Sequence, residues 1–124
     1  MAASEGFKEF LQDQLAGFGP VAIRNMFSGA GLYADGVMFA IIANDVLYFK
    51  ADETSARAFA DEGMRPFTYT RKGKPPVAMS YWEVPPRLLE EPDELVAWAH
   101  EAHRIACAAK PPKPRAKKKR KSGN

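Results

Sequence analysis

The stretch LYADGVMFAIIANDVLYFK, residues 32–50, decides the fold. It contains three runs of strand-forming residues separated by two dipeptides, Asp35-Gly36 and Asn44-Asp45. Asp-Gly is a preferred pair for a type I′ turn, which needs positive φ at both central residues and joins antiparallel strands. Asn44-Asp45 is a second candidate for such a turn. Because turns this short leave no length for a crossover, the sequence predicts an antiparallel meander of three strands.

The middle run of this meander, residues 37–43, is apolar on both of its faces. An antiparallel strand with one wet face would alternate between apolar and polar residues. We therefore expect this strand to be central in its sheet and covered on its second face. The cover is either helices of the same chain or a second subunit, and the sequence leaves both alternatives open.

Further elements are predicted on both sides of the meander. Residues 5–17 follow the capping residue Ser4 and predict an amphipathic helix, whose inward stripe is Phe7, Phe10, Leu11, Gln14, Leu15 and Phe18. Residues 21–27 predict a strand that the Gly-rich residues 28–31 end. Later segments predict a helix over 52–62, strands over 67–70 and 77–84, and a last helix from about 92 to 109. The order α-β-β-β-β-α-β-β-α indicates an α+β domain in two layers, a mainly antiparallel sheet with flanking helices.

The charge of the chain is divided between two regions. The whole sequence has 18 Lys and Arg against 15 Asp and Glu, a net charge of +3. Eight of the cations lie in residues 110–121, where no acid occurs, which leaves ten against 15 and a net charge of −5 in residues 1–109. We expect residues 1–109 to form one domain. We expect residues 110–124 to form a disordered basic tail, because this segment has almost nothing apolar to bury.

Other features bear on the compartment. The single cysteine, Cys107, excludes an intramolecular disulfide and fits a reducing environment. The N-terminal residues lack the pattern of a signal peptide, and the longest apolar run is much shorter than the roughly 20 residues of a membrane helix. We therefore expect a cytoplasmic protein without a membrane partner.

No group of residues predicts catalysis or a cofactor. The glycines near residue 30 lack the Gly-Lys-Ser/Thr of a phosphate loop, and no nucleophile elbow occurs. The one candidate metal set is His100, His103 and Cys107, which share one side of the last helix. Because three ligands on one rigid helix rarely close a tetrahedral site, we interpret the set as a solvated polar face. We expect no enzyme, no cofactor and no metal.

Basic residues are the candidates for binding. The tail should attract any polyanion, with a strong dependence on salt and no sequence specificity. A basic loop follows the strand that contains Tyr69, and adjacent Tyr81 and Trp82 point to opposite faces of their strand, so one of them is expected in the core. The candidate nucleic-acid contacts are Arg71, Lys72, Lys74, Lys113, Arg115, Lys117, Lys118, Lys119, Arg120 and Lys121.

Several motifs resemble the TfoX/Sxy N-terminal domain family. They are RNMFSGAGLY (24–33), DGVMFA (35–40), LYFK (47–50) followed by Asp52, FTY (67–69) and MSYWEVP (79–85), and they occur in order over roughly residues 7–108. The resemblance implies a stand-alone N-terminal domain with a secretion-chaperone-like fold and no assigned catalytic residues. The family takes its name from bacterial regulators of natural competence, which are thought to act with a cyclic-AMP receptor protein at promoters.

Three hypotheses about function follow. The first, slightly preferred, is a TfoX-like regulator of transcription or competence that acts through a protein partner, with nonspecific DNA affinity from the tail. The second is a stand-alone adaptor or chaperone-like module that forms a homodimer through its sheet and has no role in transcription. The third is a domain that binds a metal or small ligand on its last helix.

Overall fold

The computed structural model describes residues 4–26, 29–69, 72–75 and 77–109. Six strands in this part of the chain form one antiparallel sheet in the order β1-β2-β3-β4-β6-β5. The elements are α1 (Glu5–Gln14), β1 (Ala22–Met26), β2 (Gly29–Ala34), β3 (Val37–Ala43), β4 (Val46–Lys50), α2 (Glu53–Asp61), β5 (Pro66–Tyr69), β6 (Val77–Glu83), the short 3₁₀ helix η1 (Pro86–Glu90) and α3 (Pro92–Ala109). The predicted α+β class and element order are confirmed, and η1 is an addition that was not predicted.

Both predicted turns of the meander have the expected backbone. Asp35 and Gly36 have φ values of 54° and 76°, and Asn44 and Asp45 have values of 54° and 57°. Positive φ at both central residues is the requirement of a type I′ turn, whose twist matches that of the strands it joins. The turns thereby set the antiparallel pairing of β2 with β3 and of β3 with β4.

The first strand does end before residues 28–31, at Met26, but residues 29–31 do not form a break as predicted, because they begin β2. Gly29 pairs with Ala43, and a Cβ atom on Gly29 would lie 2.1 Å from the carbonyl oxygen of Ile42. The glycine is therefore needed for a close approach of two strands and not for a turn. Residues 27 and 28 lie outside the described residues.

A β-bulge explains why β3 is apolar without alternation. Leu32 pairs with Ala40 while Tyr33 pairs with Met38, so Phe39 has no partner on β2. In a bulge, two residues of one strand oppose one residue of the other, which interrupts the alternation of faces. Phe39 and Ala40, although adjacent, are both 0% exposed and both belong to the main hydrophobic core.

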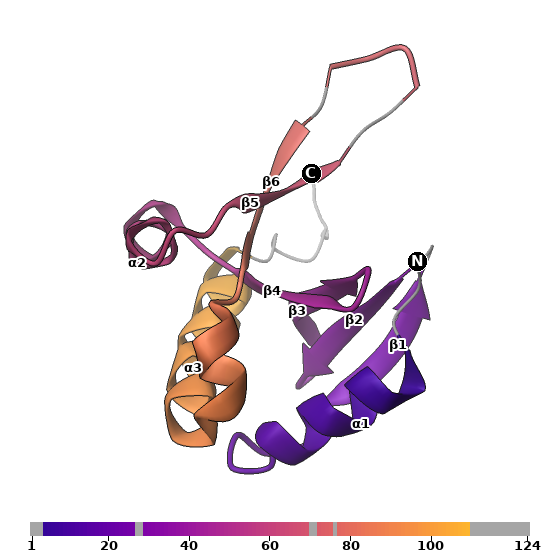
Figure 1. The fold of residues 1–124 in the computed structure, drawn as a ribbon, viewed down its shortest axis with the longest axis vertical. Helices are drawn as coiled ribbons and strands as arrows, with labels where there is room; N and C mark the ends of the chain where they lie inside the picture. The colour runs from indigo at the N-terminus through magenta and orange to yellow at the C-terminus, as the bar shows by residue number, and fades with distance from the viewer. Residues whose placement is uncertain (1–3, 27–28, 70–71, 76, 110–124) are drawn as a thin grey trace, which may run out of the picture.

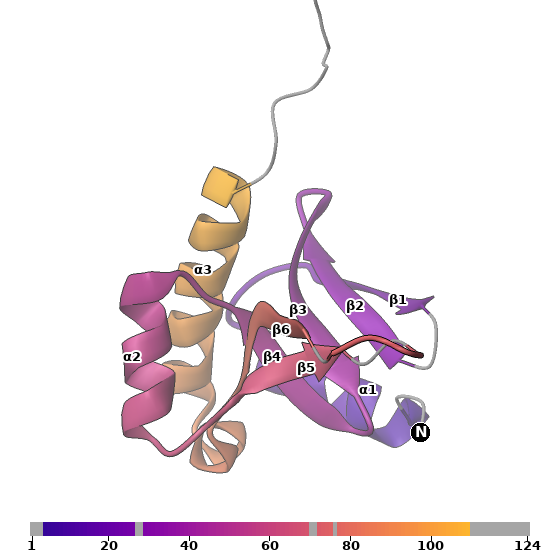
Figure 2. The same cartoon turned by 90° about the horizontal axis from the view of Figure 1, so that it is seen from above.

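The main core lies between one face of the sheet and the helices. Leu11 and Leu15 from the α1 region, Phe59 from α2 and Leu95 from α3 are buried in it with the strand residues Ala30, Leu32, Phe39, Ala40, Ile42, Leu47 and Phe49. Figure 1 shows α1 and α3 gathered on the same side of the β1–β4 part of the sheet, and Figure 2 shows α2 alongside α3. Helices of the chain itself therefore cover this face.

The first helix is shorter than predicted, and one residue of its predicted inward stripe is exposed. It ends at Gln14, and the following turn is closed by hydrogen bonds from the backbone N–H groups of Leu15 and Phe18 to carbonyls three or four residues earlier. Phe10, predicted on the inward stripe, is 37% exposed, and its ring stacks on that of Phe7 with 6.3 Å between centroids. The inward stripe is therefore narrower than the run of apolar residues predicts.

The second face of β3 carries no helix among the described residues, so helices of the chain cover one face only. Ile41 nevertheless is only 7% exposed, and it stands between its ladder partners Gly31 and Tyr48. No helix in the described part of the chain has both the length and the apolar character needed to cross a membrane.

Candidate nucleic-acid interface

The face of the sheet opposite the helices, called here the open face, is rich in aromatic rings. Strand alternation and register place Tyr33, Tyr48 and Tyr81 on it, and the Phe67 ring packs edge-on against Tyr48 with 5.1 Å between ring centroids. Tyr81 is only 8% exposed and forms part of the floor of this face, whereas the other three rings are half-buried. Met79, two residues before Tyr81 on the same strand face, is 39% exposed.

Two cations lie over these rings. The guanidinium of Arg24 is 5.4 Å from the ring centroid of Tyr33, and the Lys50 ammonium is 5.3 Å from that of Tyr81. Such cation–π contacts hold the charge in place without neutralising it. Lys50 also donates a hydrogen bond of 2.6 Å to the hydroxyl of Ser80. Within the described residues neither cation has a carboxylate partner.

The hydroxyls of Tyr48 and Tyr81 remain neutral near pH 7. Burial raises the pKa of Tyr48, and the negative charge of Glu83 raises it further. Burial also raises the pKa of Tyr81, with a smaller contribution from Tyr33. Both phenols therefore keep their proton and can donate a hydrogen bond to an acceptor.

Acidic residues are concentrated on the opposite side of the molecule. Twelve of the 15 acids lie in helices or cap them, and the other three are Asp35 and Asp45 in turns and Glu83 in β6. The ion pairs of the described residues also involve helices: Lys8 pairs with Glu5 within α1, and Arg104 with Glu101 within α3. The strands of the sheet hold two cations and one acid, so charge divides the molecule into an acidic helix side and a weakly basic open face.

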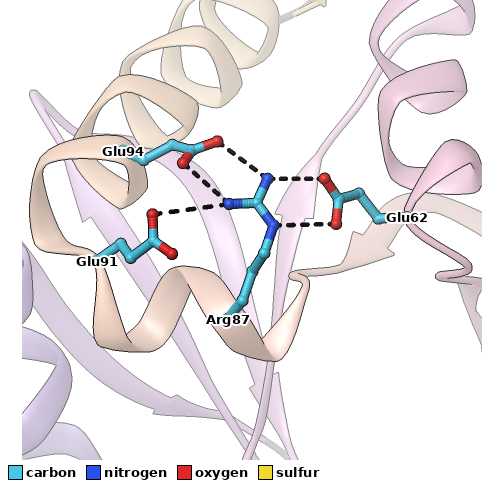
Figure 3. A network of polar contacts seen from close by, with 4 residues as sticks. All are labelled: Glu62, Arg87, Glu91 and Glu94. Atoms are coloured by element: carbon cyan, nitrogen blue, oxygen red, sulfur yellow. Dashed lines mark hydrogen bonds and ion pairs between the residues drawn. The ribbon is translucent and has the colours of Figure 1, made fainter.

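The largest group of ion pairs, shown in Figure 3, is built around Arg87 of η1. Its guanidinium donates to Glu62 at 2.7 and 3.1 Å and to Glu94 at 2.9 and 3.0 Å, and Glu91 lies 3.8 Å away. Hydrogen bonds from Arg87 lower the pKa of both Glu62 and Glu94. Because these residues come from the ends of α2, η1 and α3, we interpret the group as a structural connection and not as a binding site.

The predicted contact residues are only partly placed. Lys72 and Lys74 are exposed on the loop between β5 and β6, and Gly73 between them has a φ of 74°. Arg71 lies outside the described residues, and so does the whole predicted tail, including Lys113, Arg115, Lys117, Lys118, Lys119, Arg120 and Lys121. The structure brings Lys72 and Lys74 to the hairpin that carries Phe67.

Ala109, the last residue of α3, lines a hollow of about 260 Å³ together with Lys50, Tyr81 and Met38. Lys50 and Tyr81 belong to the open face. Ala109 therefore lies at the border of that face.

The expectation of a solvated polar face on the last helix is wrong for His103. Its ring is half-buried, packs edge-on against Phe18 and Phe39, and has Nε2 at 2.9 Å from the carbonyl oxygen of Ala34. Since a carbonyl only accepts, Nε2 carries the proton and donates. His100 and Cys107 are exposed. Among the described residues, no three His, Cys, Asp or Glu side chains are grouped so that they could hold a metal ion.

Sequence reasoning missed most of the open face, although one signal for it was present. Trp82 packs against the core while Tyr81 lies on the other face, as the strand period predicts for adjacent residues. The same period, applied to β2, β4 and β1, would have placed Tyr33, Tyr48 and Arg24 on the side of Tyr81. The bulge at Phe39 concealed this pattern, because it interrupts the alternation of the central strand.

The architecture defines the class of the protein as a small α+β domain with a helix-covered sheet and an open aromatic face. A family model, the TfoX N-terminal domain, matches residues 13–106. The match covers most of the chain, so the protein belongs to the TfoX N-terminal domain family, as the sequence motifs predicted. A search among curated proteins gave no match. Membership of this family suggests a competence-related regulatory role.

Proposed function

We propose that this protein is a TfoX-like regulator that acts by binding and not by catalysis. It contacts a protein partner and contributes nonspecific affinity for duplex DNA through its basic tail. Family membership over residues 13–106 is the observation that carries the proposal. The division of charge supports it, because eight cations without an acid follow a domain of net charge −5.

The DNA part is tested by fluorescence anisotropy of a labelled 20-base-pair duplex with the full chain at about 50 and 200 mM salt. Contact with about six phosphates should weaken binding roughly 10³-fold between these concentrations. The comparison is a full-length variant in which the five cations of residues 117–121 are replaced by Gln, and each lost contact should lower the salt slope by about one. If the wild-type chain does not bind the duplex at 50 mM salt, the DNA part is wrong and the adaptor hypothesis takes its place.

The partner part is tested separately. The family resemblance implies a cyclic-AMP receptor protein as the partner. We expect the full chain to slow the dissociation of that receptor from a duplex carrying its site, and to leave a duplex without the site unaffected. Equal dissociation rates with and without the chain would contradict this part of the proposal.

A further inference from the structure

The proposed function makes no use of the open face. Its rings are partly exposed, and its two cations have no carboxylate partner among the described residues. We propose that the open face binds single-stranded DNA. Bases stack on Tyr33, Tyr48 and Phe67, and phosphates are held by Arg24 and Lys50.

The rings select the single-stranded form. In a duplex the faces of the bases are stacked on one another, and only their edges are accessible in the grooves. A single strand offers free base faces, which stack on aromatic side chains presented by a sheet. Tyr33 lies on β2, Tyr48 on β4 and Phe67 on β5, so the rings are spread across the sheet and can be reached by successive bases.

The charges select a polyanion. Arg24 and Lys50 are already held against rings, at 5.4 and 5.3 Å from the centroids. Their side chains therefore lose little further conformational freedom when a phosphate binds them. Lys72 and Lys74 are exposed on the hairpin that carries Phe67. The acid-rich helices on the opposite side repel a polyanion and leave the open face as the favourable approach.

The same charges argue against two other occupants. A second copy of the chain, docked face to face, would bring Arg24 and Lys50 near their own equivalents without a matching excess of acid. The chain's own segment 110–121 carries eight cations and would be repelled in the same way. Ala109, the residue before that segment, lines the hollow with Lys50 and Tyr81.

This inference deepens the proposed function and rests on it only in the choice of DNA over RNA. The surface is different, since duplex binding is assigned to the tail and single-strand binding to the folded domain. The two can therefore fail independently.

The test uses the full-length chain in which the five cations of residues 117–121 are replaced by Gln, so that the tail contributes little. The ligand is a labelled dT₂₀ oligonucleotide at about 50 mM salt. Tyr33→Leu and Phe67→Leu each remove a ring but keep an apolar side chain. Each is expected to weaken binding about tenfold. The matched control is Phe10→Leu, which removes the exposed ring of α1 on the helix side and should leave binding unchanged.

Charge variants provide a second measurement that does not depend on packing of the rings. Arg24→Gln should weaken binding to dT₂₀ several-fold, whereas Arg57→Gln on the exposed side of α2 should not. Glu83→Gln removes the only acid of the strands and should strengthen binding about two- to threefold, a gain that a folding defect cannot produce. Melting temperatures of all variants show whether each chain is folded.

The proposal stands if dT₂₀ binds, the open-face variants weaken it and Phe10→Leu and Arg57→Gln do not. It is overturned if the open-face and control variants bind dT₂₀ alike, or if Glu83→Gln has no effect. Tighter binding of rU₂₀ than of dT₂₀ would overturn the assignment to DNA. Concentration-dependent dimerisation that Phe67→Leu abolishes, without binding of dT₂₀, would identify the face as a contact between copies and overturn the proposal. If the wild-type chain does not bind the duplex but the dT₂₀ results are as expected, only the proposed tail function is rejected.

Discussion

Replacement of Phe39 by Ala tests the bulge in β3 most directly. The ring is 0% exposed, and its centroid lies 5.1 Å from that of Phe18, 5.8 Å from that of His103 and 6.2 Å from that of Phe49. Core Phe→Ala substitutions cost roughly 3–5 kcal/mol through lost burial and the remaining cavity. With three ring neighbours, we expect Phe39→Ala to lower the free energy of unfolding by about 4 kcal/mol and the melting temperature by roughly 20 °C.

The assay is urea unfolding of the full chain at pH 7, followed by the fluorescence of Trp82 and Trp98. Both indoles pack against the main core, so they report its loss. The control is Phe10→Ala, the same change at a residue that is 37% exposed, and its expected cost is below about 1 kcal/mol. Equal costs for the two variants would refute the argument, because Phe39 would then not be the side chain that the bulge turns into the core.

Three further predictions concern the strands, the ion pairs and the buried histidine. Gly29→Ala should destabilise the fold by about 2 kcal/mol or more in urea unfolding, because the added Cβ would lie 2.1 Å from the carbonyl oxygen of Ile42. The control Gly6→Ala on α1 should be neutral or stabilising, because the space around Gly6 is open. The pKa of Glu62 and Glu94 is lowered in the folded state, so their contribution is present above the unfolded pKa of about 4.3 and is lost as pH falls through the folded values. Arg87→Gln should therefore lower the melting temperature at pH 7 and much less at pH 3, and parallel losses at both pH values would contradict the assigned role of Arg87. His103→Leu removes the hydrogen bond to the Ala34 carbonyl and should lower the free energy of unfolding, measured in urea, by about 1 kcal/mol. If the loss is no larger than that of His100→Leu, at an exposed histidine, then this bond is not needed for stability.

The elements that sequence reasoning placed correctly depend on local chemistry. Asp35-Gly36 and Asn44-Asp45 adopt positive φ because Gly, Asn and Asp tolerate that conformation, and each pair is adjacent in the chain. Asp52 caps α2 by accepting from the N–H of Ser55, while the Ser55 hydroxyl accepts from the N–H of Asp52. These interactions join residues that are no more than four positions apart, so they can be predicted from the sequence alone.

Two of the errors concern contacts between residues distant in the chain. Gly29 looks like a turn residue until Ile42 is seen beside it, and the half-burial of His103 depends on Phe18, Phe39 and Ala34. Phe10 fits the helical stripe by spacing, yet it is 37% exposed in the folded chain. Neither these tertiary separations nor this exposure can be read from a local pattern.

The candidate site shows the same division. The eight cations of residues 110–121 and the basic loop are visible in the linear sequence, as are the motifs of the TfoX N-terminal domain family. The open face is not, because it combines side chains from five strands whose order in the sheet differs from their order in the chain at β6 and β5. Turns, caps, charge segregation and family are thus properties of the amino-acid sequence itself. Which face the helices cover, and which rings and cations are left together on the other, depends on how the strands pair and bend, and only the tertiary structure establishes that.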